Sequence, residues 1–297
     1  MGNAGHVFAL SFDVPELLAI VERNNMSPHP LRVCYLLLSP TFGMHQYTAD
    51  IANRMALAGH EVHLVTTRRY PRDRYLPSIA VHTPVDTRNS GFSLDALDHA
   101  GARAVRPVLA SIEPDVVHLT GPHLWNVSLL RFLRRRRIPT VHTLHDLDPH
   151  SGVSYGRLLR GWNALVLQGA DHILVHGQCY QQQLQRLAPG RVAFTPLLHL
   201  FLGAPWAEAP DELAHGVSHE PWALFFGRLE RYKGLPDLLQ AIAALPFEGS
   251  DGPRLVVAGP GALAEHWPRP LPPGVELRNR LIGDEEAIDL FRRCGLL

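Results

Sequence analysis

The chain has 297 residues, enough for two domains, and its 46% hydrophobic and 19% charged residues are typical of a globular protein with a sizeable core. Its 28 Lys and Arg residues balance 28 Asp and Glu residues, which argues against a general nucleic-acid binder, because such proteins carry a basic excess. Cys34, Cys179 and Cys294 are far apart and form no C-x-x-C pair, so the sequence indicates neither a disulfide framework nor a zinc ribbon and predicts reduced thiols in the cytoplasm.

Residues 1–30 are predicted to be an N-terminal extension. A short helical pattern at 12–21 is broken by the Ser-Pro-His-Pro sequence at 27–30. The stretch has no basic head, and Asp13 and Glu16 interrupt its apolar part, so it does not have the pattern of a signal peptide. No uninterrupted apolar run of the chain reaches the length needed to span a membrane.

Residues 31–200 alternate short apolar runs with helical patterns. The runs are rich in Val, Ile and Leu and almost continuously apolar, as strands buried on both faces should be. This alternation implies β-α-β units and a doubly wound parallel sheet. The predicted strands are 31–38, 61–66, 115–119, 140–144, 172–175 and 192–195, and the predicted helices are 46–57, 94–111, 123–136, 155–167 and 180–187.

Residues 201–221 are predicted to be a linker, because they contain several prolines and acidic residues without a clear period. The alternation restarts in residues 222–297, with predicted strands at 223–226, 255–258 and 275–277 and predicted helices at 235–244 and 285–293. The chain then stops at Leu296 and Leu297, which resemble the opening of a further strand. We therefore expect 222–297 to be a partial second domain.

Several candidate site residues follow predicted strands of the first domain, at the edge where open parallel sheets bind ligands. Gly43 and His45 lie in the turn after the first strand, and Gly43 permits a close approach of a ligand to the backbone. His145 and Asp146 end the strand at 140–144, and strand alternation places His145 on the opposite side from His142. A histidine here can hydrogen-bond the hydroxyl groups of a ligand while it stays neutral near pH 7. His118 lies inside a strand and is predicted to be a packed core residue.

The loop at 227–234 of the second domain is predicted to bind an anion. Gly227 ends an apolar strand, Arg228 and Lys233 follow, and a helical pattern begins after Gly234. Two cations thus precede a helix N-terminus, whose free N–H groups and partial positive charge favour a diphosphate. Gly259 and Gly261 follow the next strand, where they would let the backbone come close to the same ligand.

The order Gly-Arg-Leu, a short gap, then Lys-Gly resembles the donor-phosphate loop of family four glycosyltransferases with the GT-B fold. The Asp-Val-Val-His sequence at 115–118 and the Thr-Leu-His-Asp sequence at 143–146 are also similar to that family. The resemblance implies two Rossmann-like α/β domains with doubly wound parallel sheets, of which the second is incomplete here. It also implies a retaining, metal-independent transfer of a sugar from a nucleotide-diphosphate donor to an acceptor hydroxyl, without a cofactor.

The resemblance assigns roles to the residues singled out above. His145 would contact the transferred sugar as the catalytic residue, and the donor would bind to Gly227, Arg228, Lys233, Gly259 and Gly261. The acceptor side would contain Gly43, His45 and Asp146. The acceptor could be a glycan, a lipid-linked compound or a small molecule, and nucleic acid is not expected as a partner. No metal ligand is assigned, although several histidines and acidic residues lie close together at 142–150.

Other interpretations of the sequence stay open. The family carries two further acidic residues beyond the point where this chain stops, so the chain could be a non-catalytic acceptor-binding fragment. It could also be a GT-B nucleotide-sugar epimerase, which interconverts donors without an acceptor. The run Arg134–Arg137 ends a predicted helix, where its cations complement the helix dipole. The same run could contact anionic lipids and place the protein at the inner face of the membrane.

Overall fold

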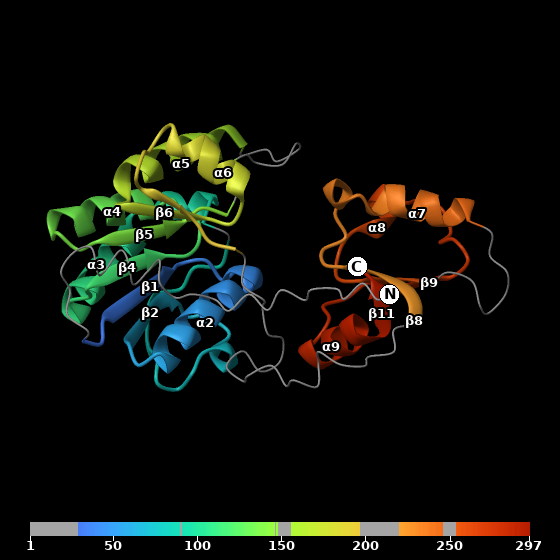
Figure 1. Ribbon diagram of the computed structural model, residues 1–297, viewed down its shortest axis with the longest axis horizontal. Coiled ribbons are helices and arrows are strands. Elements are labelled where there is room, and N and C mark those ends of the chain that lie inside the picture. The colour runs from blue at the N-terminus through green and yellow to red at the C-terminus, as the bar shows by residue number, and fades with distance from the viewer. Residues whose placement is uncertain (1–28, 90, 146, 148–155, 197–219, 246–253) are drawn as a thin grey trace, which may run out of the picture.

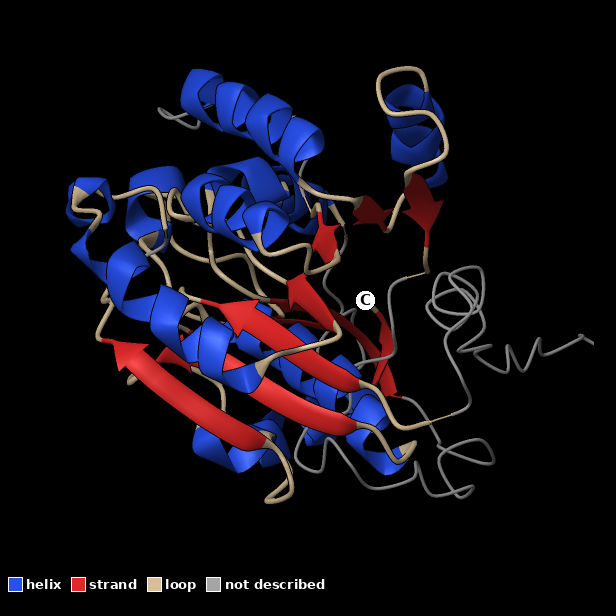
Figure 2. Cartoon of the chain, turned by 90° about the vertical axis from the view of Figure 1, so that its left-hand side faces the viewer, coloured by secondary structure: helices blue, strands red, loops and turns tan. Residues whose placement is uncertain are grey.

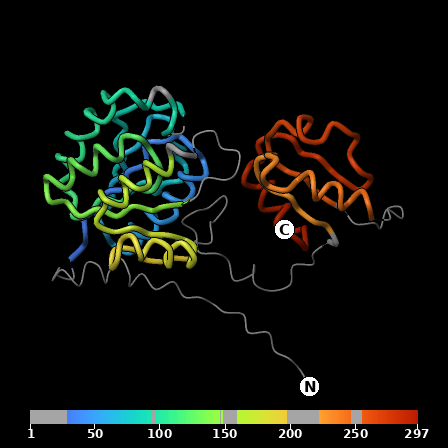
Figure 3. The backbone as a smooth tube through the Cα atoms, turned by 90° about the horizontal axis from the view of Figure 1, so that it is seen from above, coloured from blue at the N-terminus to red at the C-terminus, as the bar shows by residue number. Residues whose placement is uncertain are grey.

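The computed structural model describes residues 29–89, 91–145, 147, 156–196, 220–245 and 254–297, and these residues form two α/β parts (Figure 1). Figure 3 shows the two parts as separate bodies, each with its own sheet and its own helices. The predicted extension at 1–30 falls almost entirely outside the described residues, as does most of the predicted linker at 201–221.

The first part is built on a seven-stranded sheet with the order β3-β2-β1-β4-β5-β6-β7, and every neighbouring pair is parallel. The order reverses between β1 and β4, the kind of switch point at which doubly wound sheets bind ligands. The strands are β1 (Arg32–Leu37), β2 (Glu61–Thr67), β3 (Ala80–Val85), β4 (Val116–Leu119), β5 (Thr140–Thr143), β6 (His172–Val175) and β7 (Val192–Phe194).

Helices cover both faces of this sheet (Figure 2). Val33 and Tyr35 of β1 point into a core cluster with the helix after β1, whereas Cys34 and Leu36 point into a second cluster with the helices after β3, β4 and β5. The strands are therefore buried on both sides, which explains their almost continuous apolar sequence. The helices are α2 (Phe42–Leu57), α3 (Ala100–Ile112), α4 (Asn126–Arg135), α5 (Gly156–Gly169) and α6 (Gln178–Gln185), with short 3-10 turns η1 (Arg72–Arg74) and η2 (Leu94–Leu97).

In this part the sequence missed one strand, and one predicted helix was wrong. Strand β3 was not predicted, because it lies at the sheet edge, is half-buried, and includes Pro84 beside polar residues rather than an apolar run. The single helix predicted at 94–111 is split into η2 and α3. Its second piece begins where the Asp98 carboxylate accepts a hydrogen bond of 2.9 Å from the Ala100 N–H, a local bond typical of a helix start.

The second part has a four-stranded parallel sheet with the order β10-β9-β8-β11. On β9, Leu255 and Val257 face a cluster formed with α7 and α8, and Val256 faces a cluster formed with α9. The strands are β8 (Glu220–Phe226), β9 (Arg254–Ala258), β10 (Val275–Arg278) and β11 (Cys294–Leu296), and the helices are η4 (Arg231–Lys233), α7 (Leu235–Ala244), α8 (Leu263–His266) and α9 (Asp284–Arg293).

An ion pair joins the two parts, between the Arg74 guanidinium at the end of η1 and the Asp284 carboxylate at the start of α9. The Arg74 guanidinium also lies over the Phe42 ring, 5.2 Å from its centroid, at the first residue of α2. Among the described residues, no helix combines the length and the apolar character that crossing a membrane requires.

Candidate functional site

The ends of β8 and β9 press against each other, and glycines make this possible. Gly227 and Gly259 both have positive φ angles, of 129° and 142°. The Gly227 N–H donates to the Ala258 carbonyl at 2.9 Å, and a Cβ added to Gly259 would lie 2.0 Å from the Gly227 carbonyl oxygen. Only glycine fits such a contact, so these two residues are needed for the packing of the loops themselves.

Gly261, in the loop after β9, also packs against the loop after β8. A Cβ at this position would lie 2.8 Å from the Leu229 backbone oxygen. The Asn279 side chain holds Gly261 from the other direction, accepting from its N–H at 3.0 Å and donating to its carbonyl at 2.9 Å. The sequence did not single out Asn279, although its place two residues after the predicted strand at 275–277 would have pointed to this edge.

The predicted cations lie at this edge of the second sheet. The Arg228 side chain is 67% exposed and its Nη1 atom lies 2.6 Å from a Glu230 carboxylate oxygen. The Lys233 ammonium lies over Gly227, 2.8 Å from the position that a Cβ on Gly227 would take. Helix α7 starts two residues after Lys233, behind Gly234 with a φ of 78°. The structure thus gathers two cations around a glycine and a helix N-terminus, an arrangement that favours an anion.

On the first sheet, His145 lies at the carboxyl edge beside the end of β5. Its Nε2–H donates to the Thr120 carbonyl at 2.9 Å, and its ring meets the Tyr47 ring edge-on, with centroids 4.9 Å apart. The carbonyl accepts only, so Nε2 carries the proton and the tautomer is fixed. Tyr47 comes from α2, and His145 therefore lies beside the helix that follows the first turn.

His176 stands next to His145 and was missed in the sequence. It follows the last residue of β6, and its ring centroid lies 5.6 Å from that of His145. Its Nδ1–H donates to the Thr195 carbonyl at 2.8 Å, which leaves Nε2 as an acceptor, and this buried atom has no hydrogen-bond partner. The rule that singled out His145, a polar residue directly after a buried strand, would have found His176 as well.

Two further histidines lie beneath this pair and belong to the core. His118 of β4 is 4% exposed and its Nε2 bonds to the Thr143 hydroxyl at 2.8 Å. His142 of β5 is 1% exposed and its Nδ1–H donates to the Leu119 carbonyl at 3.0 Å. Burial, reinforced by neighbouring histidines, lowers the pKa of each imidazole to about 3, so both are neutral near pH 7. The prediction that His118 is a packed core residue is confirmed.

The acceptor-side residues are placed differently from the prediction. Gly43 is exposed at the second residue of α2, with no atom within 4 Å of its Cβ position. His45 is fully buried and bonds to the Tyr75 hydroxyl at 2.8 Å, so its predicted position facing an acceptor was wrong. It turns inward because it is the fourth residue of α2, one turn before Ala49 on the buried face of the helix. Asp146 lies outside the described residues.

The arginine run at 134–137 has contacts within the fold. The Arg134 guanidinium donates to the Gln168 and Gly169 carbonyls at 2.6 and 3.1 Å, at the end of α5. The Arg136 guanidinium lies over the Phe132 ring, 5.3 Å from its centroid. Within the part of the chain that the structure describes, no group of three or more His, Cys, Asp or Glu residues could hold a metal ion.

Comparison with known proteins identifies the family of this architecture. The model of Glycosyltransferase Family 4 matches residues 43–196. Among solved structures, HepE of Anabaena in complex with UDP-glucose has a TM-score of 0.60 and 18% identity over 87% of this chain and 71% of that one. A glycosyltransferase of Rickettsia africae has a TM-score of 0.56 and 12% identity over 90% and 72% of the two chains.

A third solved structure comes from a protein named for a different activity. A putative UDP-N-acetylglucosamine 2-epimerase of Listeria monocytogenes has a TM-score of 0.54 and 13% identity, over 89% of this chain and 71% of that one. At these identities the likeness to solved structures establishes the fold alone. No curated protein sequence matches the chain.

The contact between Gly259 and Gly227 gives a stability prediction. Replacing Gly259 by Ala should destabilise the second part by more than about 2 kcal/mol, because the methyl group would overlap a backbone carbonyl at a positive φ angle. Gly283→Ala is the matched control, since no atom lies within 4 Å of its Cβ position. Urea unfolding of the two variants measures the difference, and equal midpoints would contradict this account of the loops.

The buried histidines give an acid-stability prediction. The unfolded chain protonates them near pH 6.5, whereas His118 and His142 in the folded chain stay neutral down to about pH 3. Unfolding therefore takes up protons within this window, and stability present above pH 6.5 should fall as the pH falls, by up to about 1.4 kcal/mol per pH unit for each histidine.

Thermal unfolding at a series of pH values tests this dependence. His118→Gln keeps a hydrogen-bonding atom near the position of Nε2 but does not titrate, so its loss of stability in acid should be shallower by one proton. An unchanged pH dependence in this variant would show that His118 is not a source of the acid sensitivity.

Proposed function

Because the chain belongs to Glycosyltransferase Family 4, we propose that it transfers a sugar from a nucleotide-diphosphate donor to an acceptor hydroxyl, with retention of configuration and without a metal or a cofactor. The observation that carries this proposal is the cluster of Arg228, Lys233 and the α7 N-terminus at the carboxyl edge of the second sheet. The solved HepE structure, which shares the fold, contains UDP-glucose and supports a nucleotide sugar as the donor.

In the proposed reaction, the bond between the anomeric carbon and the diphosphate oxygen breaks, and its electron pair goes to the diphosphate. The acceptor oxygen forms the new bond on the same face, and its proton passes to the departing oxygen, the nearest base on that face. Arg228 and Lys233 stabilise the charge that develops on the diphosphate. Gly227, Gly259 and Gly261 keep the backbone close enough for the donor to reach the helix N-terminus.

Glu230 has a place in this proposal that the sequence did not suggest. Its carboxylate pairs with Arg228 at 2.6 Å, so the diphosphate competes with an internal anion for this guanidinium. Such a pair keeps a cation positioned when no donor is bound.

His145 and His176 form the proposed sugar-binding pair of the first part. Their rings are 5.6 Å apart at the end of the sheet, and each ring donates one N–H to a backbone carbonyl. The Nε2 atom of His176 is an acceptor that a sugar hydroxyl satisfies. The exposed start of α2 at Gly43 forms the proposed acceptor side, with Asp146 as a further member, and the acceptor is a glycan, a lipid-linked compound or a small molecule.

The same proposal places the protein in the cytoplasm, with the helix end at 134–137 as a peripheral contact to an anionic membrane face. All four arginines of this run are exposed, and basic clusters gain about 1 kcal/mol per residue near such a surface.

The epimerase is the second candidate function, favoured by the likeness to the Listeria structure. A nucleotide-sugar epimerase changes the donor in the absence of any acceptor. Incubation of the protein with UDP-N-acetylglucosamine alone, followed by NMR of the sugar, distinguishes this activity from transfer.

The donor site gives a binding prediction. Arg228→Ala should weaken UDP binding roughly tenfold or more, because one charge-assisted hydrogen bond contributes about 1.5–3 kcal/mol. Arg231→Ala removes the same charge from an exposed residue of η4 and is the matched control for the general electrostatic effect. Calorimetric titration with UDP and GDP measures both, and equal affinities of the two variants would exclude Arg228 from the donor site.

The histidine pair gives a kinetic prediction. His176→Asn keeps an N–H near Nδ1 for the Thr195 carbonyl but removes the Nε2 acceptor, so kcat should fall on the order of tenfold while the melting temperature stays near that of the parent. His145→Ala should also lower kcat. Release of UDP from UDP-glucose measures turnover, and a large loss of stability with normal turnover would make either residue a core residue.

A further inference from the structure

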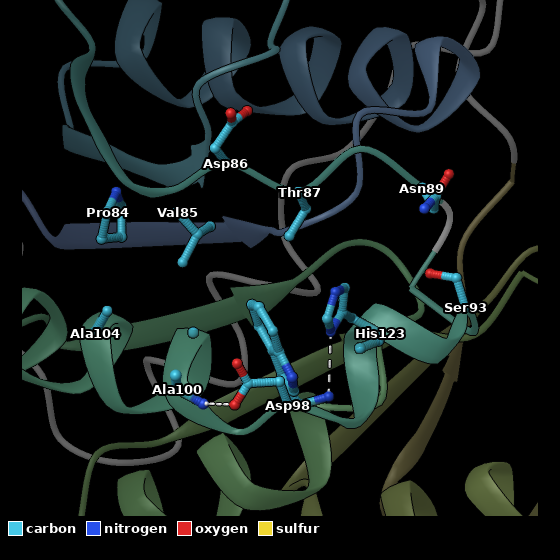
Figure 4. A pocket seen from close by; sticks show the side chains of 13 residues that line it. Pro84, Val85, Asp86, Thr87, Asn89, Ser93, Asp98, Ala100, Ala104 and His123 are labelled. Carbon is cyan, nitrogen blue, oxygen red and sulfur yellow. Dashed lines mark hydrogen bonds between the residues drawn. The ribbon is translucent and has the colours of Figure 1, made fainter.

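A cavity of about 370 Å³ lies in the first part, between the end of β3 and the first turn of α3 (Figure 4). This volume is within the range of small-molecule pockets. It is distinct from the two glycine-rich loops of the second part. Its polar side chains come from Asp86, Thr87, Asn89, Ser93, Asp98, His123 and Trp125.

The charges of the cavity disfavour an anionic ligand. Asp86 and Asp98 contribute two carboxylates, and none of the lining residues is a lysine or an arginine. Arg69 pairs with Asp86 at 2.9 Å, and the Ala100 N–H occupies one oxygen of Asp98. Both carboxylates keep further acceptor capacity, because each ionised carboxyl group has about four lone-pair sites. The cavity therefore favours a ligand with several hydroxyl or ammonium donors.

The Trp125 indole supplies a donor on the wall of this cavity. The side chain is 5% exposed, and its Nε1–H has no hydrogen-bond partner. By contrast, the indole N–H of the equally buried Trp162 donates to the His123 carbonyl at 3.0 Å. An unpaired buried N–H costs about 1–3 kcal/mol of free energy, so its presence at a cavity points to a ligand oxygen that satisfies it.

Two neighbours hold the Trp125 ring in place. Gly101 of α3 packs on it so closely that a Cβ there would lie 1.9 Å from the ring. The ring centroid of His123 lies 4.4 Å from that of Trp125. A fixed indole N–H next to the carboxylates of the cavity suits a sugar ring, whose rim carries hydroxyl groups.

One short loop connects the cavity with His145. The Thr120 carbonyl, which accepts from His145, begins this loop, and His123 and Trp125, which line the cavity, end it. The bridge between Gly91 and His123 fixes the loop against the segment after β3. The cavity and His145 thus lie at the same carboxyl edge of the first sheet.

We propose that this cavity binds the acceptor as an uncharged or cationic hydroxylated ring, such as a sugar or an amino sugar. The Trp125 Nε1–H donates to an oxygen of the ring, and the carboxylates of Asp86 and Asp98 accept from its hydroxyl or ammonium groups. The role of the bound ring as the acceptor rests on the proposed transferase function. Binding of the ring does not, because it is measured without a donor.

The test compares the two buried tryptophans. Saturation-transfer NMR of the full chain with methyl glucoside, glucosamine and glucose 1-phosphate should show the first two ligands bound and the anionic one excluded. Trp125→Phe should weaken their binding roughly tenfold, the loss of one hydrogen bond to a ligand. Trp162→Phe removes the same atoms but leaves the His123 carbonyl without its bond, so it should lower the melting temperature more and leave ligand binding intact.

A carboxylate variant separates the ligand classes. Asp98→Asn keeps an oxygen for the Ala100 N–H but removes the charge, so it should weaken glucosamine binding more than methyl glucoside binding. Unchanged binding in Trp125→Phe, preferred binding of glucose 1-phosphate, or no binding of any of the three probes would overturn the proposal.

UDP titration distinguishes this failure from a failure of the proposed function. If UDP binds and depends on Arg228 while the cavity variants bind the probes like the parent, the cavity proposal fails alone. If the probes bind as expected but UDP does not bind, the donor proposal fails and the cavity remains a sugar site.

Discussion

The parallel pairing of strands is the constraint on which the rest of this structure depends. In both sheets the carboxyl ends of all strands meet at one edge, so the loops that leave them must pack against each other in a small space. In the second part, Gly227, Gly259 and Gly261 allow that packing, because a side chain at Gly259 or Gly261 would meet backbone atoms of the adjacent loop. The same loops carry the two cations of the proposed donor site.

Carbonyl groups at the edge of the first sheet decide what its histidines can do. His142, His145 and His176 each bond to a backbone carbonyl, which fixes one proton and leaves the other nitrogen as an acceptor. Burial keeps His118 and His142 neutral, whereas His145 and His176 lie at the end of the sheet. Two of the buried polar atoms without partners in the described residues, Nε2 of His176 and Nε1 of Trp125, lie at the proposed sites and are informative there, since most buried polar groups in proteins are paired.

The proposed donor site of the second part is positively charged, whereas the cavity of the first part is negatively charged. Arg228 and Lys233 favour a diphosphate in the second part, whereas Asp86 and Asp98 favour hydroxyl and ammonium groups in the cavity of the first part. This separation suits a transferase whose donor carries the negative charge and whose acceptor does not. Arg74 and Asp284 join the two parts close to the start of α2.

The sequence by itself determined the alternation of strands and helices and the two-part α/β architecture, because parallel strands buried on both faces are apolar runs. It also determined the loop at 227–234, and helix α7 after this loop begins and ends at the predicted residues 235–244. Local pattern could not show β3, an edge strand containing Pro84, or the inward direction of His45. Only the tertiary structure brought His176 beside His145 and left the Trp125 indole unpaired at a cavity. Both depend on contacts between segments far apart in the chain, and no local periodicity encodes them.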